Sequence, residues 1–252
     1  MKKSYELHEK KYHELLKKGI LNWDDAQKNL DTFFGIEKNT LKFLEKLFSQ
    51  SLLPKEGSVL ELGCGTGPLL NWFYKKGFKG TGVDISETAI KIAKQNREDT
   101  SIEYFCSNIL DWKPNDKQRF DLVLDGHCLH CIPYKDERKR IIQNLKTYLK
   151  ENGKFILLSM CKPINSKALK ESYQNCLFEK NILYTPIFNA QKFKNYKIKN
   201  NISYVPIRYI APPESIIKEI EEEGFECCLS EIKNDSKEDC NASLIAVFRF
   251  NH

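Results

Sequence analysis

The stretch Ser58–Pro68, SVLELGCGTGP, changes from an apolar run to a glycine-rich loop and then to the start of a helix. The short apolar run SVLELG is typical of a buried strand in a parallel sheet. Gly63, Gly65 and Gly67 follow, and the apolar spacing of PLLNWFYKKGF after them predicts a helix. Glycine lets a ligand approach the backbone, and a helix N-terminus offers unpaired N–H groups. The stretch therefore predicts a strand–loop–helix unit that binds a ligand.

The residues that follow alternate between strand-like and helix-like patterns. Strands are predicted at 80–86, 101–110, 120–126 and 154–160, helices at 87–98, 135–153 and 212–225, and two closing strands at 226–232 and 242–250. We expect the helix at 135–153 to end at Gly153. Alternation of this kind predicts βαβ units, and hence a mostly parallel sheet covered on both faces.

Two segments lie outside this alternation. Residues 1–50 carry helical spacing, with one helix ending at the KKG of residues 17–19 and a second predicted from about Asp31 to Gln50. Residues 161–211 are rich in Asn, Lys, Phe and Tyr, and we expect them to be irregular. At 252 residues the chain fits one domain, divided into segments 1–50, 58–160, 161–211 and 212–252.

Composition favours a soluble globular protein. Hydrophobic residues make up 41% of the chain and charged residues 29%, and the longest apolar runs are too short to span a membrane. The N-terminus has no apolar segment of the signal-peptide type, so we expect a cytoplasmic location. The net charge of +6 comes from lysines spread along the chain, which makes nucleic acid an unlikely partner. No pattern in the sequence indicates an oligomeric state.

Two acids narrow the chemistry of the expected ligand. Asp84 ends the second strand, where a doubly wound fold places an acid that binds ribose hydroxyls. Glu61 lies two residues before the first glycine, where its carboxylate would repel a pyrophosphate and attract a cation. A nucleoside with a positive charge and no phosphate fits better than a dinucleotide, and S-adenosylmethionine is such a molecule.

Taken together, these segments resemble the class I S-adenosylmethionine-dependent methyltransferases. VLELGCGTG is similar to their first motif and GVDIS to their second, while FCSNILDW, FDLVLDGHCLHCI and LKENGKFILLSM occupy the places of the later ones. The final helix and two strands also match that family. The resemblance implies a three-layer Rossmann-like sandwich with a seven-stranded, mostly parallel sheet and an antiparallel last strand, preceded by N-terminal helices.

The same resemblance implies roles for individual residues. Asp84 would accept hydrogen bonds from both ribose hydroxyls, and Asp125 would face the amino-acid part of the cofactor. Asn108 stands where the family usually has Asp, although its carbonyl oxygen can still accept from an adenine amino group. The implied cofactor-binding residues are Glu61, Gly63, Cys64, Gly65, Gly67, Asp84, Ile85, Asn108, Ile109 and Asp125.

The methyl acceptor is less well defined. The Asn/Asp-Pro-Pro-aromatic tetrad of some amino-methyltransferases is missing after the fourth strand, and there is no Pro-Cys dipeptide of the cytosine-C5 type. We therefore expect a small-molecule O, N or S acceptor, with Trp23, Arg208 and Tyr209 as candidate substrate contacts. A methyltransferase acting on RNA or protein, and a cofactor-binding regulator without transferase activity, remain as alternatives.

The segment DGHCLHCI, residues 125–132, allows several interpretations. Cys128 and Cys131 have the spacing of half a zinc site, of a redox pair or of a binder of soft ligands such as arsenite, but no second ligand pair at finger spacing accompanies them. We expect the nine cysteines to be free thiols and the protein to hold no metal. The resemblance instead places His127 and His130 beside the transferred methyl group, as catalytic bases or substrate ligands, with purely structural hydrogen bonding as the alternative.

Overall fold

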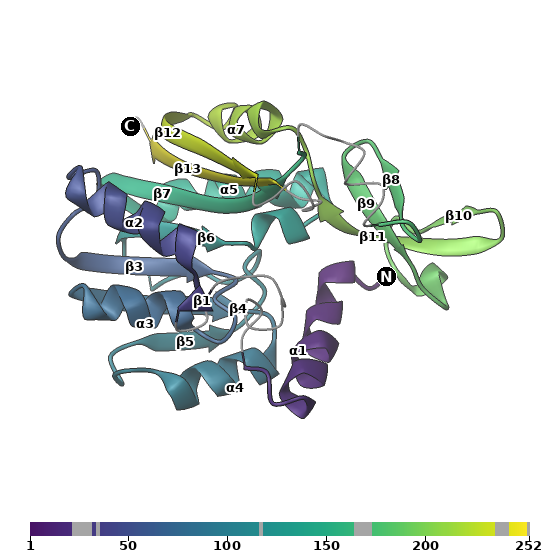
Figure 1. Cartoon of the computed structure of the whole chain (residues 1–252), viewed down its shortest axis with the longest axis horizontal. Helices are drawn as coiled ribbons and strands as arrows, with labels where there is room; N and C mark the ends of the chain where they lie inside the picture. The colour runs from purple at the N-terminus through teal and green to yellow at the C-terminus, as the bar shows by residue number, and fades with distance from the viewer. Residues whose placement is uncertain (22–31, 34–35, 116–117, 164–172, 235–241, 251–252) are drawn as a thin grey trace. The chain divides into compact units, whose positions relative to one another are not determined.

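The computed structural model describes residues 1–21, 32–33, 36–115, 118–163, 173–234 and 242–250. Seven strands form one mixed sheet in the order β12-β13-β7-β6-β3-β4-β5 (Figure 1). Their bounds are β3 Gly57–Leu62, β4 Phe78–Asp84, β5 Glu103–Cys106, β6 Phe120–Gly126, β7 Leu149–Cys161, β12 Phe225–Asn234 and β13 Ala242–Phe250. Strands β3 to β6 pair in parallel, and β12 pairs antiparallel with β13. The Rossmann-like fold class expected from the sequence is confirmed.

The chain divides into two compact units. We call one the glycine-loop unit, which comprises His8–Gly126 and Thr147–Lys154. The other, the C-terminal unit, comprises Met1–Leu7, His127–Lys146 and Phe155–His252. The expectation of a single domain with four segments stays a prediction.

In the glycine-loop unit, two helices pack on the parallel strands. α3, Pro68–Lys75, contacts β3 and β4, while α4, Glu87–Asn96, contacts β4 and β5. Their apolar faces are buried, including Leu70 and Phe73 on α3 and Ala89 and Ala93 on α4. The helices thus hold the carboxyl ends of β3 and β4, where the glycine loop and Asp84 lie.

The N-terminal segment differs from the prediction at its second helix. α1 runs over Leu7–Lys17, but α2 runs over Lys38–Ser49 rather than from Asp31. Two short antiparallel strands, β1 Thr32–Phe33 and β2 Ile36–Glu37, precede it. The side chain of Glu37 caps the helix by accepting from the Asn39 N–H at 3.2 Å, and this cap sets the helix start.

In the C-terminal unit, α7, Pro213–Glu221, begins at the prolines as expected. α5, Lys135–Tyr148, lies mostly in this unit, but it ends before the predicted Gly153 because β7 already begins at Leu149. The prediction was wrong here because helical spacing continues into Lys150 and Glu151, which belong to the strand.

The segment 161–211 is more regular than expected. It contains a four-stranded antiparallel sheet in the order β10-β11-β9-β8, with bounds Lys197–Lys199, Ile202–Tyr209, Ile182–Pro186 and Leu177–Glu179 respectively. Lys180–Asn181 and Asn200–Asn201 have positive φ and form the tight turns of two hairpins. These asparagine-containing turns were the sequence signal that the expectation of irregular structure overlooked.

The sequence also led us to expect free cysteines and no segment long enough to span a membrane. All eight cysteines within the described residues are free. None of the helices in the described ranges combines the length and apolar character required to cross a bilayer.

A substitution at Gly82 on β4 can test how tightly the side chains behind the glycine loop are packed. A Cβ there would lie 2.8 Å from each of Cys64 Sγ, Leu70 Cδ1 and Tyr104 Cδ1. We predict that Gly82→Ala lowers the free energy of unfolding by about 1–3 kcal/mol, since overpacking forces these side chains apart. Chemical denaturation measures the change. The exposed Lys79→Ala on the same strand is the control, and an equal loss in both variants would contradict the prediction.

Candidate active site

The loop between β3 and α3 is held in a backbone conformation that glycine allows. Gly65 has φ of 52° and Gly67, the N-cap of α3, has φ of 83°. The N–H groups of Gly63 and Cys64 donate to the Val83 carbonyl of β4 at 2.8 and 3.1 Å. The loop therefore turns back along the end of β4, and its glycines leave the backbone free of side chains there.

Asp84 links this loop to the next one. Its Oδ2 accepts from the Gly65 N–H at 2.9 Å, and its Oδ1 accepts from the Ser86 N–H at 2.8 Å. Burial raises the pKa of Asp84, although these two backbone donors oppose the rise. A carboxylate has about four acceptor positions, so two remain for the hydroxyl groups of a ligand.

Glu61 is buried without a full set of partners. It is 2% exposed, and its Oε2 has no hydrogen-bond partner within the described part of the chain. Burial raises the pKa of Glu61 well above 4.5, and the nearby charges of Asp84 and Asp125 raise it further. An unsatisfied buried carboxyl oxygen is costly, so a donor from a bound ligand would relieve it.

Glu61, Asp84 and Asp125 make the floor of this site acidic. Asp125 at the end of β6 is 1% exposed, and all three carboxyl groups belong to the glycine-loop unit. Such a site favours a cation and disfavours a phosphate. No group of three or more His, Cys, Asp or Glu side chains in the described ranges is arranged to hold a metal ion. The acidic floor, with the unpartnered Oε2 of Glu61, fits an organic cation that carries N–H and O–H donors.

The remaining predicted cofactor residues surround the same strand ends. Ile85 follows β4 and is half-buried, whereas Cys64 and Ile109 are buried. The Oδ1 of Asn108 accepts from the Leu110 N–H at 3.0 Å, so the side chain closes its own turn and keeps one lone pair for another donor. The structure thus gathers all ten predicted cofactor residues in one unit, at the carboxyl ends of four strands.

Sequence reasoning missed two residues of α1 that lie on this site. The Glu9 carboxylate accepts from Ser86 Oγ at 2.6 Å and from Thr88 Oγ1 at 2.5 Å, at the N-terminus of α4. Burial alone would raise the pKa of Glu9, but these hydrogen bonds lower it. The Tyr12 hydroxyl lies against Gly65, only 2.5 Å from where a Cβ would be. No sequence signal links helix 7–17 to the glycine loop, because these contacts span more than fifty residues.

The two predicted catalytic histidines lie in the C-terminal unit. His127 follows β6 in a left-handed conformation with φ of 69°, and its ring centroid is 5.7 Å from that of His130. Atoms packed around His127 and the charge of Arg208 lower its pKa, although the residue as a whole is exposed. His130 is 3% exposed, and burial lowers its pKa, so its ring is neutral at pH 7.

The three predicted substrate residues have different surroundings. Arg208 of β11 places its Nη1 3.1 Å from His130 Nε2. Tyr209 does not point to open space, because its ring stacks on the Arg138 guanidinium at 3.6 Å. Trp23 lies outside the described residues. The structure therefore brings Arg208 to a predicted catalytic residue and gives Tyr209 a packing role.

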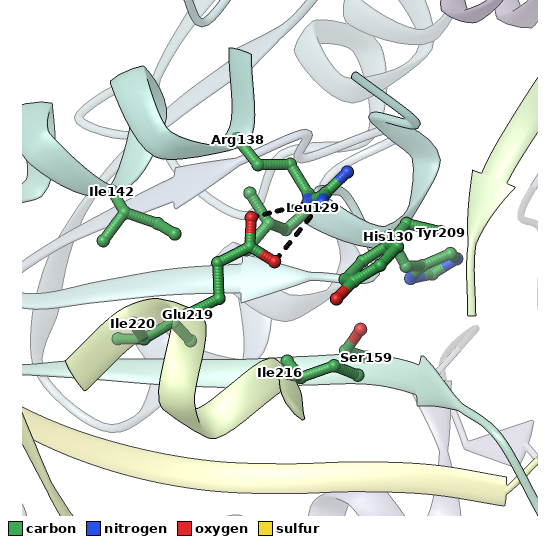
Figure 2. A pocket seen from close by; sticks show the side chains of 9 residues that line it. All are labelled: Leu129, His130, Arg138, Ile142, Ser159, Tyr209, Ile216, Glu219 and Ile220. Carbon is green, nitrogen blue, oxygen red and sulfur yellow. Dashed lines mark hydrogen bonds and ion pairs between the residues drawn. The ribbon is translucent and has the colours of Figure 1, made fainter. Parts of the chain in front are cut away.

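Figure 2 shows a small cavity beside Tyr209, with space for about one water molecule. Arg138 and Glu219 meet there as a buried pair, with Nε–Oε1 at 3.0 Å and Nη2–Oε2 at 3.3 Å (Figure 2). Arg138 Nη1 also donates to the Ile132 carbonyl at 2.9 Å. The guanidinium makes these three hydrogen bonds and stacks on Tyr209, all within its own unit, so the cavity lies at a junction of α5 and α7.

Comparisons with known proteins agree with this geometry. The profile of a family described as a methyltransferase domain matches residues 53–237. The ubiquinone biosynthesis O-methyltransferase of Coxiella burnetii is 34% identical over 134 residues, which are 52% of this chain and 53% of that protein. The chain thus matches about half the length of these curated relatives.

Two other similarities extend further along the chain. The protein-lysine N-methyltransferase EFM4 of Saccharomyces cerevisiae is 25% identical over 176 residues, covering 67% of this chain and 70% of that protein. The crystal structure of a SAM-dependent methyltransferase from Methanosarcina mazei superposes with a TM-score of 0.63 at 17% identity, covering 81% of this chain and 96% of that one. At this identity the structural likeness shows the fold.

The raised pKa of Glu61 predicts how the stability of the folded protein depends on pH. Because its pKa is raised in the folded state, the folded protein holds this proton more tightly than the unfolded chain. Stability should therefore fall as the pH rises above about 4.5, by about 1.4 kcal/mol for each unit of the rise in pKa. We predict that Glu61→Gln flattens this fall and raises Tm at neutral pH. Thermal melts from pH 4 to 9 test it, with the exposed Glu56→Gln as control. Parallel curves for the wild type and Glu61→Gln would refute the assignment.

Proposed function

The chain belongs to the family of methyltransferase domains, and from this premise we propose that it transfers a methyl group from S-adenosylmethionine to a small-molecule O, N or S nucleophile, in the cytoplasm. The match covers residues 53–237, which include the whole glycine-loop site from β3 to β6. The proposal concerns the cofactor, the acceptor and the residues that serve each.

The unpartnered, buried Oε2 of Glu61 carries the cofactor part of the proposal. S-adenosylmethionine has a positive sulfonium, a positive ammonium group and ribose hydroxyls, and no phosphate. An acidic floor under a glycine loop suits all of these features and disfavours a dinucleotide. Glu61 and Asp125 would attract the charged methionine part, while Asp84 would accept from the ribose.

The other residues of the site would complete the binding. The glycines of the Gly63–Gly67 loop carry no side chain that would keep a ligand from the backbone, although residues 64–67 are buried, and Ile85 and Ile109 would supply apolar surface for an adenine ring. Tyr12 and Glu9 hold α1 against the glycine loop and the start of α4, which would shield the site from water. When bound, S-adenosylmethionine supplies an electrophilic methyl group on a good neutral leaving group.

Support for a small-molecule acceptor comes from the similarity to a ubiquinone biosynthesis O-methyltransferase at 34% identity. The even spread of lysines along the sequence points the same way, because a nucleic-acid substrate favours a clustered basic surface. A protein acceptor is the second candidate, and the similarity to a protein-lysine N-methyltransferase favours it.

His127 and His130 are the proposed bases for an acceptor that must lose a proton. A neutral imidazole can take that proton at pH 7, and the lowered pKa of His130 keeps the ring neutral. Nδ1 of His130 already accepts from the Met160 N–H at 3.4 Å, so His130 can act as a base only when that weak contact is released. Arg208 is the proposed contact for an anionic or polar group of the acceptor, since its guanidinium is half-buried beside His130. Trp23 and Tyr209 are kept as weaker substrate candidates.

Cofactor binding can be measured without knowing the acceptor. We predict that Asp84→Asn weakens binding of S-adenosylmethionine or S-adenosylhomocysteine at least tenfold, because it removes charge-assisted hydrogen bonds to the ligand and to Gly65. Isothermal titration calorimetry gives Kd directly. The exposed Glu87→Gln on α4 is the matched control and should bind as the wild type does. Failure of the wild-type protein to bind either molecule would overturn the proposed cofactor.

The rate of methyl transfer can test which class of acceptor the protein uses and whether His127 or His130 acts as the base. Production of S-adenosylhomocysteine is followed with pools of small phenols, amines and thiols, and separately with protein extracts. We predict turnover with a small-molecule pool, and a loss of a hundredfold or more in His127→Ala or His130→Ala if that residue is the base. The exposed His13→Ala is the control. Turnover with protein alone would support the second candidate, and cofactor binding without any turnover would favour a non-catalytic regulator.

A further inference from the structure

Cys131, at the end of the short helix η3 (Leu129–Cys131), lies among strong hydrogen-bond donors in the C-terminal unit. Its Sγ is 2.8 Å from Nη1 of Arg208, and the side chain of His130 also donates to it. Both the cysteine and the histidine are buried, at 6% and 3% exposure. The reaction proposed above makes no use of this sulfur.

The tautomer of His130 follows from its other neighbour. Its Nδ1 lies 3.4 Å from the backbone N of Met160, which can only donate. We assign the proton of the neutral ring to Nε2, because a proton on Nδ1 would face the Met160 N–H. Nε2 is then a donor, and so is Arg208 Nη1, 3.1 Å away. Two donors that face each other need a shared acceptor, and the Cys131 sulfur occupies that position.

The thiol form of Cys131 makes weaker hydrogen bonds with these neighbours than the thiolate form does. As a thiol it could donate to the His127 carbonyl oxygen 3.5 Å away, which is one weak hydrogen bond. As a thiolate it accepts from a guanidinium and an imidazole N–H, and these charge-assisted bonds are stronger. Burial alone would raise the pKa of Cys131, but Arg208 and His130 outweigh it and lower the pKa to about 6.

We propose that Cys131 is a resident thiolate, held by Arg208 and His130, and that it is a site of oxidation by hydroperoxides. The thiolate sulfur attacks one oxygen of hydrogen peroxide, an S–O bond forms and the O–O bond breaks. The sulfur is oxidised to sulfenic acid, Cys–SOH, and the second peroxide oxygen leaves as hydroxide, which takes a proton from the buffer to become water. The low exposure of Cys131 favours small oxidants over bulky ones.

The same neighbours argue against the metal interpretation of the Cys128–Cys131 pair. The guanidinium of Arg208 touches the sulfur, so a metal cation at that sulfur would meet a fixed positive charge. Within the described residues, no metal-binding group of three or more side chains includes either cysteine. The arrangement therefore suits a nucleophile and not a metal ligand.

Other cysteines of the chain provide internal references. Cys161 is fully buried, and burial raises its pKa to about 12. Cys228 is exposed, and so reports the reaction of an accessible thiol in the same sample. A reagent that discriminates by charge state should select Cys131, whereas one that discriminates only by exposure should select Cys228.

The first experiment measures the rate of alkylation by iodoacetamide as a function of pH. The full-length protein carries Cys128→Ser, so that the label on the shared peptide belongs to Cys131, and mass spectrometry follows Cys131, Cys161 and Cys228 separately. We expect a half-maximal rate near pH 6 for Cys131. Arg208→Gln should raise that midpoint by at least one unit, which lowers the rate at pH 7 about twofold or more, whereas Arg208→Lys keeps the charge and should change it less.

The second experiment uses hydrogen peroxide with a 1,3-diketone that traps sulfenic acids. We expect an adduct on Cys131 in the Cys128→Ser protein, none on Cys161, and none at position 131 in Cys131→Ser. A midpoint for Cys131 in the ordinary thiol range near pH 8.5, or labelling of Cys228 while Cys131 stays unmodified in the folded protein, would overturn the proposal. These outcomes are measured in protein in which Arg208 and His130 are unchanged. The test therefore remains decisive even if the Arg208 variants fail to fold. Neither readout depends on methyl transfer.

Discussion

The hydrogen bond from the Gly65 N–H to Asp84 Oδ2, 2.9 Å long, joins the two loops on which the candidate site depends. Gly65 can present its N–H in this direction because its φ of 52° is accessible to glycine. Asp84 can receive it because β4 ends at that residue, beside β3 in a parallel sheet. The adjacent carboxyl ends of the two strands thus become one binding surface.

Glu61 adds an electrostatic constraint to this surface. A buried carboxyl group with one unsatisfied oxygen beside two further buried acids is unfavourable in the folded protein alone. Local instability of this kind is common where a ligand completes the interactions. The type of ligand that would complete them is a cation with hydrogen-bond donors, and this is why the proposed cofactor follows from charge as well as from family.

The three-dimensional structure changes the interpretation of the histidine and cysteine cluster at residues 127–131. As a sequence it permits a metal site, a redox pair or a pocket wall. In the folded chain, Arg208 of β11 lies against His130 and Cys131, although 77 residues separate it from the cysteine. One guanidinium therefore disfavours a metal at the sulfur and stabilises a thiolate there. Of Cys128 and Cys131, which the sequence analysis treated alike, Cys131 is the one whose neighbours stabilise a thiolate.

Local patterns were sufficient for the parallel core. Apolar runs of strand length, glycines after the first strand and an acid after the second all act through near neighbours in sequence, so they predict β3, α3, β4 and the Asp84 position correctly. The prediction was less accurate where local signals compete. Helical spacing overran the end of α5 at Tyr148, and the turns at Lys180–Asn181 and Asn200–Asn201 were read as irregular chain although they build a second sheet.

The sequence alone predicted the parallel core and the glycine loop, because strand and helix periodicities are local and the carboxyl ends of parallel strands necessarily meet. The ten cofactor residues were implied by the family resemblance and stay a prediction. Only the tertiary structure decided which side chains complete that loop and what the cysteines face. Glu9 and Tyr12 reach it from α1, and Arg208 reaches Cys131 from β11, through contacts that no spacing in the sequence encodes. Burial, hydrogen bonds and neighbouring charges, and not the residue type itself, set whether a buried thiol or carboxyl group ionises.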